Sequence, residues 1–269
     1  MKSKEEIIEL NKKQTEFYNK EDLKAGFAST MWRKIRNGLL NGYRKNYRLK
    51  DKSYLQHKEW LGDLSNKKVL DLGCYSGNAL SLYLATNAKE YLGIDLSDVG
   101  INKLSDKIKN IDSAQALAID FLSDKFTYRD FDVVYAFGVM HHFENFDLLI
   151  DRVSEVTKPG GIIVSYDPLE TSPPIVFLRK LYRPFQDDAD WEWPFTKSTL
   201  KKIETKFNIL EVKGLLGKSK YGVLLQFMPL SNSYKDRVIS EWIEEDWTST
   251  KVEDVFKCMH VTMLLETKT

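Results

Sequence analysis

The chain has 269 residues, enough to bury a full hydrophobic core in one large domain or two small ones. Its 40 Lys and Arg residues nearly balance 39 Asp and Glu residues. The net charge of +1 excludes a strongly basic protein that coats nucleic acid and an acidic disordered tail. Two cysteines, Cys74 and Cys258, exclude a disulfide framework or a four-cysteine zinc site within one chain and fit a reducing compartment.

No segment of the sequence has the pattern of a targeting signal or a membrane span. The N-terminal residues MKSKEEIIELNKK are charged throughout and do not contain the apolar stretch of a secretory signal. The longest apolar runs, Val133–Val139 and Tyr221–Leu230, fall short of the roughly 20 residues that a span needs. We therefore expect a cytoplasmic protein.

The predicted elements change character along the chain. Residues 1–65 are predicted to form amphipathic helices that extend the main domain on its N-terminal side. From residue 66 onward, strand-like and helix-like segments alternate. Strands are predicted at 68–72, 90–96, 115–119, 131–137 and 162–166, with helices over 78–86, 97–108 and 146–157 between them.

The C-terminal part of the chain departs from this alternation. Residues 168–200 are irregular and aromatic, 207–212 and 259–266 are predicted strands, and 230–256 are mostly helical with an acidic face. Alternating strands and helices are typical of a parallel sheet covered on both faces. We predict an α/β fold with a seven-stranded, mostly parallel, Rossmann-like sheet over 66–269, carrying substrate-cap insertions at about 168–200 and 214–257.

The most informative motif is a glycine-containing turn between a predicted buried strand and a helix, Asp71-Leu72-Gly73-Cys74-Tyr75-Ser76-Gly77. Glycine permits a positive φ and lets a ligand approach the backbone closely. In an open parallel sheet, ligands bind beyond the carboxyl ends of the strands, where this turn lies. The context of a preceding strand and a following helix favours a ligand site over a simple turn.

An acidic residue, Asp95, ends the next predicted strand about 20 residues later, where an acid can bind the two hydroxyls of a ribose. A role limited to capping the helix that begins near Ser97 is the alternative. The turn and the acid occur together, which favours ribose binding.

The glycine spacing separates two classes of nucleoside cofactor. A dinucleotide fingerprint requires Gly-x-Gly-x-x-Gly around a pyrophosphate, and this chain does not have that spacing. Asp71 before the turn would repel a pyrophosphate, but it suits a cofactor that carries an ammonium and a sulfonium. A nicotinamide dehydrogenase is therefore disfavoured.

Taken together, these features resemble a class I S-adenosylmethionine-dependent methyltransferase of the small-molecule type, with a ubiquinone-methyltransferase-like core. The resemblance covers roughly residues 67–167, with weaker support from the last two predicted strands. Five segments match in order: the turn at 71–77, Asp95-Leu96, Asp120-Phe121, Ala136-Phe137-Gly138-Val139-Met140-His141-His142-Phe143 and Pro159-Gly160-Gly161-Ile162.

The resemblance implies that S-adenosylmethionine binds along these segments and becomes S-adenosylhomocysteine. The turn then passes the methionine portion, Asp95 binds the ribose, and Leu96 lies at the adenine. Asp120 takes the adenine amino group, and Phe121 packs on the ring. The predicted cofactor-binding residues are Asp71, Gly73, Cys74, Tyr75, Gly77, Asp95, Leu96, Asp120, Phe121 and Phe137.

Tyr75 is a departure from the family pattern, which usually has a third glycine at this position. Its side chain either reshapes the methionine pocket, places a ring near the sulfonium as a cation–π partner, or points to solvent.

Two consecutive histidines, His141 and His142, follow the fourth predicted strand at the mouth of the expected pocket. A hydroxyl acceptor needs a base, for which histidine is usual, whereas a carboxylate or tertiary amine needs none. Neighbours in sequence cannot both face the pocket, and the alternative is that both make only structural contacts. No His/Cys cluster accompanies them, so no metal site is expected. Asp167 is a further candidate acid, with a loop cap as its alternative.

Two segments outside the core are candidates for substrate binding. Residues 31–52 carry eight Lys and Arg side chains and one acid. They form either a solvated helix face, a site for an anionic substrate, or a peripheral contact with an anionic membrane. The resemblance suggests that N-terminal helices cover the cofactor. The segment 179–195 either grips a ring-containing substrate or is a packed aromatic loop. The predicted substrate-binding residues are Tyr18, Trp32, Arg183, Trp191 and Trp193.

The sequence thus predicts methyl transfer from S-adenosylmethionine to a small molecule, with oxygen as the expected acceptor atom on a glycan, lipid-linked or polyketide-type metabolite. An RNA or protein methyltransferase is an alternative that segment 31–52 favours and the net charge disfavours; there is no strong nucleic-acid signal. A non-catalytic scaffold is a second alternative, for which Tyr75 is the only hint.

Overall fold

The structure is a computed structural model that describes residues 13–16, 19, 38, 41–185 and 191–268. Tyr18, Trp32 and much of the predicted N-terminal lid lie outside these described residues, as do residues 186–190 of the predicted cap.

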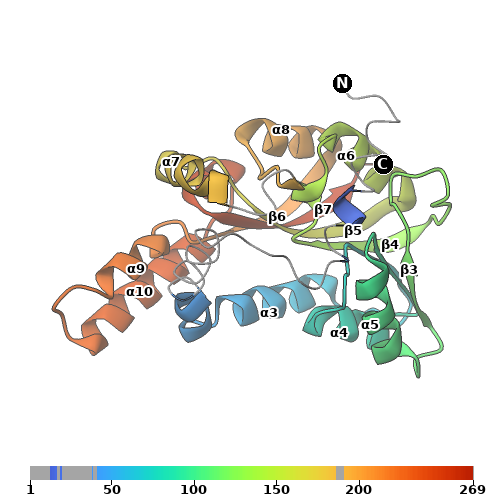
Figure 1. Cartoon of the computed structure of the whole chain (residues 1–269), viewed down its shortest axis with the longest axis horizontal. Coiled ribbons are helices and arrows are strands. Elements are labelled where there is room, and N and C mark those ends of the chain that lie inside the picture. Colours follow the sequence, from blue (N-terminus) through green and yellow to red (C-terminus); the bar gives the residue numbers. More distant parts are fainter. Residues whose placement is uncertain (1–12, 17–18, 20–37, 39–40, 186–190, 269) are drawn as a thin grey trace.

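A seven-stranded sheet forms the centre of the molecule, in the order β3-β2-β1-β4-β5-β7-β6 (Figure 1). The first five strands run parallel, while β7 is antiparallel to both of its neighbours, β5 and β6. The predicted fold class, a mostly parallel seven-stranded sheet, is therefore confirmed. The strands are β1 (Lys68–Leu72), β2 (Glu90–Asp95), β3 (Ala114–Ala118), β4 (Phe131–Phe137), β5 (Thr157–Pro168), β6 (Phe207–Leu215) and β7 (His260–Thr267).

Helices cover both faces of this sheet, as the alternating pattern predicts (Figure 1). One face packs against α3 (Leu49–Leu61), α4 (Ala79–Asn87) and α5 (Asp98–Ile108), and the other packs against α6 (Phe146–Val156) and α8 (Lys197–Lys206). Alternate residues of β4 show the division. Val133 and Tyr135 belong to the apolar cluster on the α3 side, while Val134 and Ala136 belong to the cluster on the α6 side.

Side-chain caps fix where the helices near the carboxyl edge of the sheet begin. The Asn78 side chain accepts hydrogen bonds from the backbone N–H groups of Leu80 (2.8 Å) and Ser81 (3.1 Å) at the start of α4. The hydroxyl of Ser97 accepts from Gly100 N at 3.1 Å and begins α5. Such caps satisfy N–H groups that have no partner inside the helix, so two helices start directly beside the ends of β1 and β2.

The start of β5 differs from the prediction. Helix α6 ends at Val156, and the strand begins at once with Thr157, so the Pro159-Gly160-Gly161 turn lies inside β5. The register with β4 shifts in this region, between Phe131 and Val133 of β4, and Gly160 has a φ of +71°. The strand therefore begins five residues before the predicted start at Ile162, and its pairing with β4 is irregular at the glycines.

Helix α3 is attached to the sheet by a buried histidine. The ring of His57 lies between the hydroxyls of Tyr135 (3.2 Å) and Thr262 (2.7 Å). Thr262 donates its own proton to the Ser165 carbonyl (2.7 Å), so it accepts from His57 Nε2. Burial lowers the pKa of His57 to about 3, and the ring is neutral in the folded protein.

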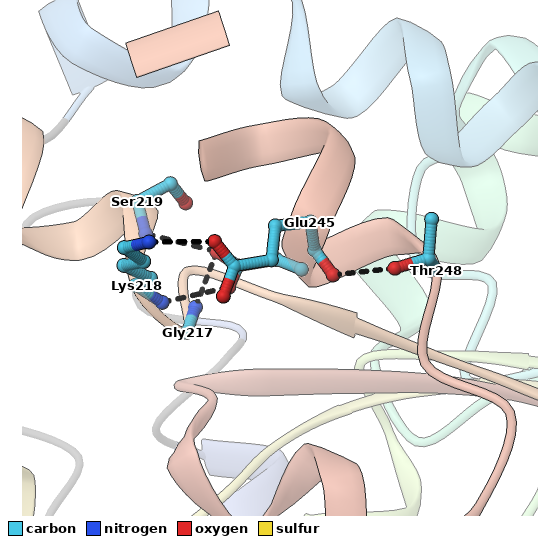
Figure 2. A network of polar contacts seen from close by, with 6 residues as sticks. Gly217, Lys218, Ser219, Glu245 and Thr248 are labelled. Atoms are coloured by element: carbon cyan, nitrogen blue, oxygen red, sulfur yellow. Dashed lines mark hydrogen bonds and ion pairs between the residues drawn. The ribbon is translucent and has the colours of Figure 1, made fainter. Parts of the chain in front are cut away.

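The insertion after β6 forms a helical hairpin at one end of the molecule, built from α9 (Gly222–Leu225) and α10 (Asn232–Trp247) (Figure 1). Its base is held by the buried carboxylate of Asp246, which accepts hydrogen bonds from the backbone N–H groups of Gly217 (2.8 Å), Lys218 (2.7 Å) and Ser219 (3.0 Å). Figure 2 shows these three donors converging on one carboxylate. The loop after β6 is thereby fixed to α10.

Candidate active site

A cavity of about 960 Å³ opens at the carboxyl edge of the parallel strands. Its lining comes from the ends of β1 and β2, the segments after β3 and β4, and the start of α8. This is the position at which open α/β sheets bind ligands. Six of the predicted cofactor-binding residues line it: Gly73, Tyr75, Asp95, Leu96, Asp120 and Phe121.

The turn after β1 is anchored to the neighbouring strand. The backbone N–H groups of Gly73 and Cys74 both donate to the Ile94 carbonyl, at 2.8 and 3.1 Å. Gly73 has a φ of +71°, and a Cβ placed on it would lie 2.2 Å from Val139 Cγ2. Glycine is thus required here because β1 and the segment after β4 approach each other closely.

Tyr75 occupies the strained position in this turn, with a φ of +44°. Its backbone N–H donates to Asp95 Oδ2 at 3.1 Å. Its ring lies against Gly100 of α5, where an added Cβ would meet Tyr75 Cδ2 at 2.5 Å. The side chain lines the cavity and is partly exposed. Its ring fits against α5 because residue 100 is a glycine and leaves room for it.

The carboxylate of Asp95 is held by the backbone on both sides. Oδ2 accepts from Tyr75 N, and Oδ1 accepts from Ser97 N at 2.8 Å. Burial raises the pKa of Asp95, against the opposing effect of these hydrogen bonds. Each carboxylate oxygen has further lone pairs, so Asp95 can accept two ligand hydroxyl protons at the cavity wall.

The segment after β3 forms the next part of the wall. Asp120 Oδ1 accepts from Leu122 N at 2.9 Å, which fixes the carboxylate at the turn. Phe121 is almost fully buried and packs edge-on against Phe126, with ring centroids 5.2 Å apart. An acid and a ring thus stand next to each other at the lining, as the resemblance implies for the adenine end.

Four predicted cofactor-binding residues lie outside the cavity lining. Asp71 is buried behind the turn, where it accepts from Tyr91 OH at 2.8 Å, and burial raises its pKa to about 6. Cys74 is buried as well, and the space beside Gly77 is filled by Leu104.

Phe137 is the fourth of these residues. It belongs to the α3 side of the sheet, where its ring stacks on Tyr166 with centroids 4.5 Å apart. Strand alternation explains its direction, because Phe137 shares a face with Tyr135. Gly138, Val139 and Phe143, from the same matched segment, line the cavity.

The two histidines both belong to the short helix η1 (Met140–His142), and their ring centroids lie 4.1 Å apart. His142 lines the cavity, and its Nδ1 lies 2.7 Å from the Trp191 carbonyl. A carbonyl only accepts, so the neutral ring carries its proton on Nδ1 and its basic lone pair on Nε2. In this tautomer Nε2 is the atom through which the ring can act as a base.

His141 has a different position. Its ring is buried outside the cavity lining, and its Nδ1 lies 2.8 Å from Asp167 Oδ1. The same oxygen accepts from the His141 backbone N–H at 3.1 Å. Burial raises the pKa of Asp167 well above its usual range. Asp167 thus caps η1, which is the alternative that the sequence left open for it.

The far end of the cavity lies between the segment after β5 and α8. Arg183 and Trp193, two predicted substrate-binding residues, line it together with Glu170. Trp191 is outside the lining and contributes through its carbonyl, which orients His142.

Sequence reasoning missed the contribution of α8 to the lining. Thr199 and Lys202 both face the cavity, and Lys202 pairs with Asp147 at 2.7 Å. Their three-residue spacing on one helix face was the available signal.

Among the described residues, no group of three or more His, Cys, Asp or Glu side chains is placed to hold a metal ion. In the same part of the chain, no helix is both long and apolar enough to cross a membrane.

Comparison with known proteins assigns the family. A family model described as "Methyltransferase domain" matches residues 43–214, which is more than half of the chain. The chain belongs to this methyltransferase family. The match covers β1 to β5 and therefore includes the turn at Gly73 and the acid at Asp95.

Two curated relatives match about half of this chain. A fatty-acid O-methyltransferase from Mycolicibacterium smegmatis is 28% identical over 158 residues, covering 57% of this chain and 51% of that protein. A probable phthiotriol/phenolphthiotriol dimycocerosates methyltransferase from Mycobacterium ulcerans is 27% identical over 144 residues, covering 52% and 49%. The chain spans about half the length of these two relatives.

Solved structures share the fold at low sequence identity. The N-methyltransferase NodS from Bradyrhizobium japonicum, in complex with S-adenosyl-L-homocysteine, has a TM-score of 0.53 at 13% identity, covering 82% of this chain and 87% of that one. A geranyl diphosphate C-methyltransferase from Streptomyces coelicolor has a TM-score of 0.55 at 11% identity, covering 82% and 81%. At such identities the likeness extends to the fold alone.

Proposed function

We propose that this protein transfers a methyl group from S-adenosylmethionine to a small-molecule acceptor. One observation carries the proposal: the Gly73 turn and the Asp95 carboxylate line the same large cavity at the carboxyl edge of the sheet. The family match and the solved neighbour that binds S-adenosyl-L-homocysteine support the same cofactor.

The residues present fit that cofactor. The side chain of Asp95 is fixed by two backbone N–H groups and keeps acceptor capacity for a ribose diol. Asp120 and Phe121 offer a carboxylate and a ring for an adenine. At Gly138, a Cβ would meet nothing within 4 Å, so the backbone borders open space where a ligand can approach.

The chain supplies positioning and a base. S-adenosylmethionine carries a methyl group that is already activated on a sulfonium, so alignment with the acceptor provides much of the rate, up to about 7–11 kcal/mol of the barrier. His142 accepts the proton of a hydroxyl acceptor on Nε2, because the Trp191 carbonyl holds the proton on Nδ1. This role favours oxygen as the acceptor atom.

The acceptor class follows from the far end of the cavity. Trp193 offers an apolar ring, Arg183 and Glu170 offer charged groups, and Lys202 is paired with Asp147. An acceptor with both an apolar part and a polar group fits this lining. The relatives named for fatty acids and dimycocerosates are consistent with such a molecule. For its place in the cell we keep the expectation from the sequence analysis, a cytoplasmic protein.

Binding measurements on two variants test the cofactor site. Asp95→Ala removes the predicted ribose acceptor, and we expect the affinity for S-adenosylhomocysteine to fall about 10–100-fold. Asp98→Ala removes an exposed carboxylate three residues away and serves as the control, with no change expected. Thermal melts of both variants verify folding. Equal affinities for Asp95→Ala and the unmodified protein would contradict the assignment.

A further inference from the structure

The apolar run at 221–230, which is too short to span a membrane, joins the core only in part: Val223 and Leu225 pack against a buried cluster, while other side chains stay exposed. Leu224 and Phe227 expose 66% and 70% of their surface, and Met228 and Leu230 are exposed as well. All four belong to α9 and the turn that follows it. Monomeric proteins seldom expose large apolar side chains in such a cluster unless the surface binds something.

A second element shows the same anomaly. Helix α7 (Pro173–Tyr182) exposes Phe177 (63%) and Leu181 (57%), which stand one turn apart on one helix face. Helix α7 and the α9–α10 hairpin lie toward the same end of the long axis of the molecule (Figure 1). We call Phe177, Leu181, Leu224, Phe227, Met228 and Leu230 the apolar end.

Cationic side chains surround the apolar end in sequence. Segment 173–185 contains three cations and no acid, and segment 220–237 contains three cations and one acid, Asp236. Asp236 Oδ1 accepts from Tyr47 OH at 2.8 Å, so this acid is engaged within the protein. The cations are Arg179, Lys180, Arg183, Lys220, Lys235 and Arg237. Lys220 donates to the backbone carbonyls of Gly217 (2.6 Å) and Lys257 (2.7 Å), whereas Lys180 and Arg237 are exposed. A surface that combines exposed large apolar groups with an excess of cations is complementary to anionic lipid headgroups above an acyl layer.

The hairpin is anchored to the rest of the protein by specific contacts. Asp246 fixes the loop before α9 to α10 through three backbone N–H groups (Figure 2). Lys235 Nζ donates to the Gln226 carbonyl at 3.0 Å and ties the turn to α10. The exposed side chains are therefore presented by an anchored scaffold.

We propose that the apolar end docks the protein on an anionic membrane surface. Leu224, Phe227 and Met228 enter the boundary between headgroups and acyl chains, and the exposed Lys180 and Arg237 side chains contact lipid phosphates. A planar membrane accounts for both elements at once, because α7 and the α9–α10 hairpin lie toward the same end of the molecule (Figure 1). The docking does not depend on methyl transfer.

Vesicle flotation tests the docking directly. The full chain is mixed with vesicles of phosphatidylcholine alone or of phosphatidylcholine with phosphatidylglycerol, at low and high salt. We expect binding to the phosphatidylglycerol vesicles that weakens with salt. In the Leu224→Ser/Phe227→Ser variant, the partition coefficient is expected to fall about tenfold or more, since two large apolar side chains leave the lipid.

A matched control separates the apolar end from general surface hydrophobicity. Leu148→Ser removes an exposed leucine on α6, away from the apolar end (Figure 1), and is expected to bind vesicles as the unmodified protein does. Absence of vesicle binding, or equal binding by the Leu224→Ser/Phe227→Ser variant, would overturn the proposal. The proposal would also be overturned if the unmodified protein were a dimer in solution and the Leu224→Ser/Phe227→Ser variant alone were a monomer. The apolar end would then bind a second copy of the chain.

Discussion

Tyr75 and Gly100 form a pair whose coupling is measurable. In most helices, Gly→Ala stabilises the fold by about 0.5–1 kcal/mol, because glycine loses more backbone entropy on folding. At position 100 of α5, the added methyl would lie 2.5 Å from Tyr75 Cδ2, 2.9 Å from Cε2 and 3.1 Å from the Tyr75 carbonyl carbon. The steric cost is expected to exceed the entropic gain.

The magnitude follows from these opposing terms. Overpacking of this kind costs about 1–3 kcal/mol, so Gly100→Ala should lower the free energy of unfolding by about 1–2 kcal/mol. In a Tyr75→Gly background the ring contacts are gone, and the same substitution should be neutral or stabilise by about 0.5 kcal/mol. The predicted coupling energy between the two positions is therefore about 1–2 kcal/mol.

Urea denaturation of the four proteins in this double-mutant cycle is the assay. Gly42→Ala is the control, because a Cβ on Gly42 meets nothing within 4 Å in a helical segment, and it should stabilise the protein. Gly100→Ala should also weaken S-adenosylhomocysteine binding about tenfold, since the displaced Tyr75 strains its hydrogen bond to Asp95. Additive effects, within about 0.5 kcal/mol, would refute the packing argument.

Three further predictions concern buried polar groups and the base. The His57 ring is neutral in the folded protein and takes up a proton in the unfolded chain below about pH 6.5. Its contribution to the free energy of unfolding is therefore present above that pH and is lost as the pH falls toward 3. In His57→Phe, the drop in unfolding free energy from about pH 7 to about pH 4 should be about 3 kcal/mol smaller; an unchanged drop in urea melts would contradict this. Asp246→Asn places an amide opposite three backbone donors and should lower the free energy of unfolding by about 2–4 kcal/mol in urea melts. The exposed Glu245→Gln is the control and should change it by less than about 1 kcal/mol. Similar losses in the two variants would refute the network. His142→Ala should lower kcat about 10²–10⁴-fold without altering cofactor affinity; an unchanged kcat on a hydroxyl acceptor would remove His142 as the base.

The sheet and its order of elements were predictable from local sequence, for identifiable reasons. Strand β4 was placed at its observed bounds, because a continuous apolar run is typical of a strand that is buried on both faces. The caps at Asn78 and Ser97 marked helix starts to within a residue or two. The early start of β5 was not predictable, because Pro-Gly-Gly reads as a loop until the pairing with β4 is known.

The candidate site was predicted in part, and the limit was three-dimensional packing. Motif position identified Gly73, Asp95 and Phe121, since these follow directly from strand ends. It did not distinguish Asp71, whose side chain turns behind the strand to Tyr91. The different positions of the two histidines, one buried and one at the cavity, were equally unpredictable from the sequence. They depend on a carbonyl from residue 191 and a carboxylate from residue 167, and both are distant in sequence.

Cofactor binding is the central claim, and one calorimetric experiment tests it. The full chain is titrated in parallel with S-adenosylmethionine, S-adenosylhomocysteine and NAD. The cavity lined by Gly73, Asp95 and Phe121 predicts saturable binding of the first two, with Kd values in the micromolar range, and no binding of NAD. Binding of NAD, or of none of the three, would contradict the account.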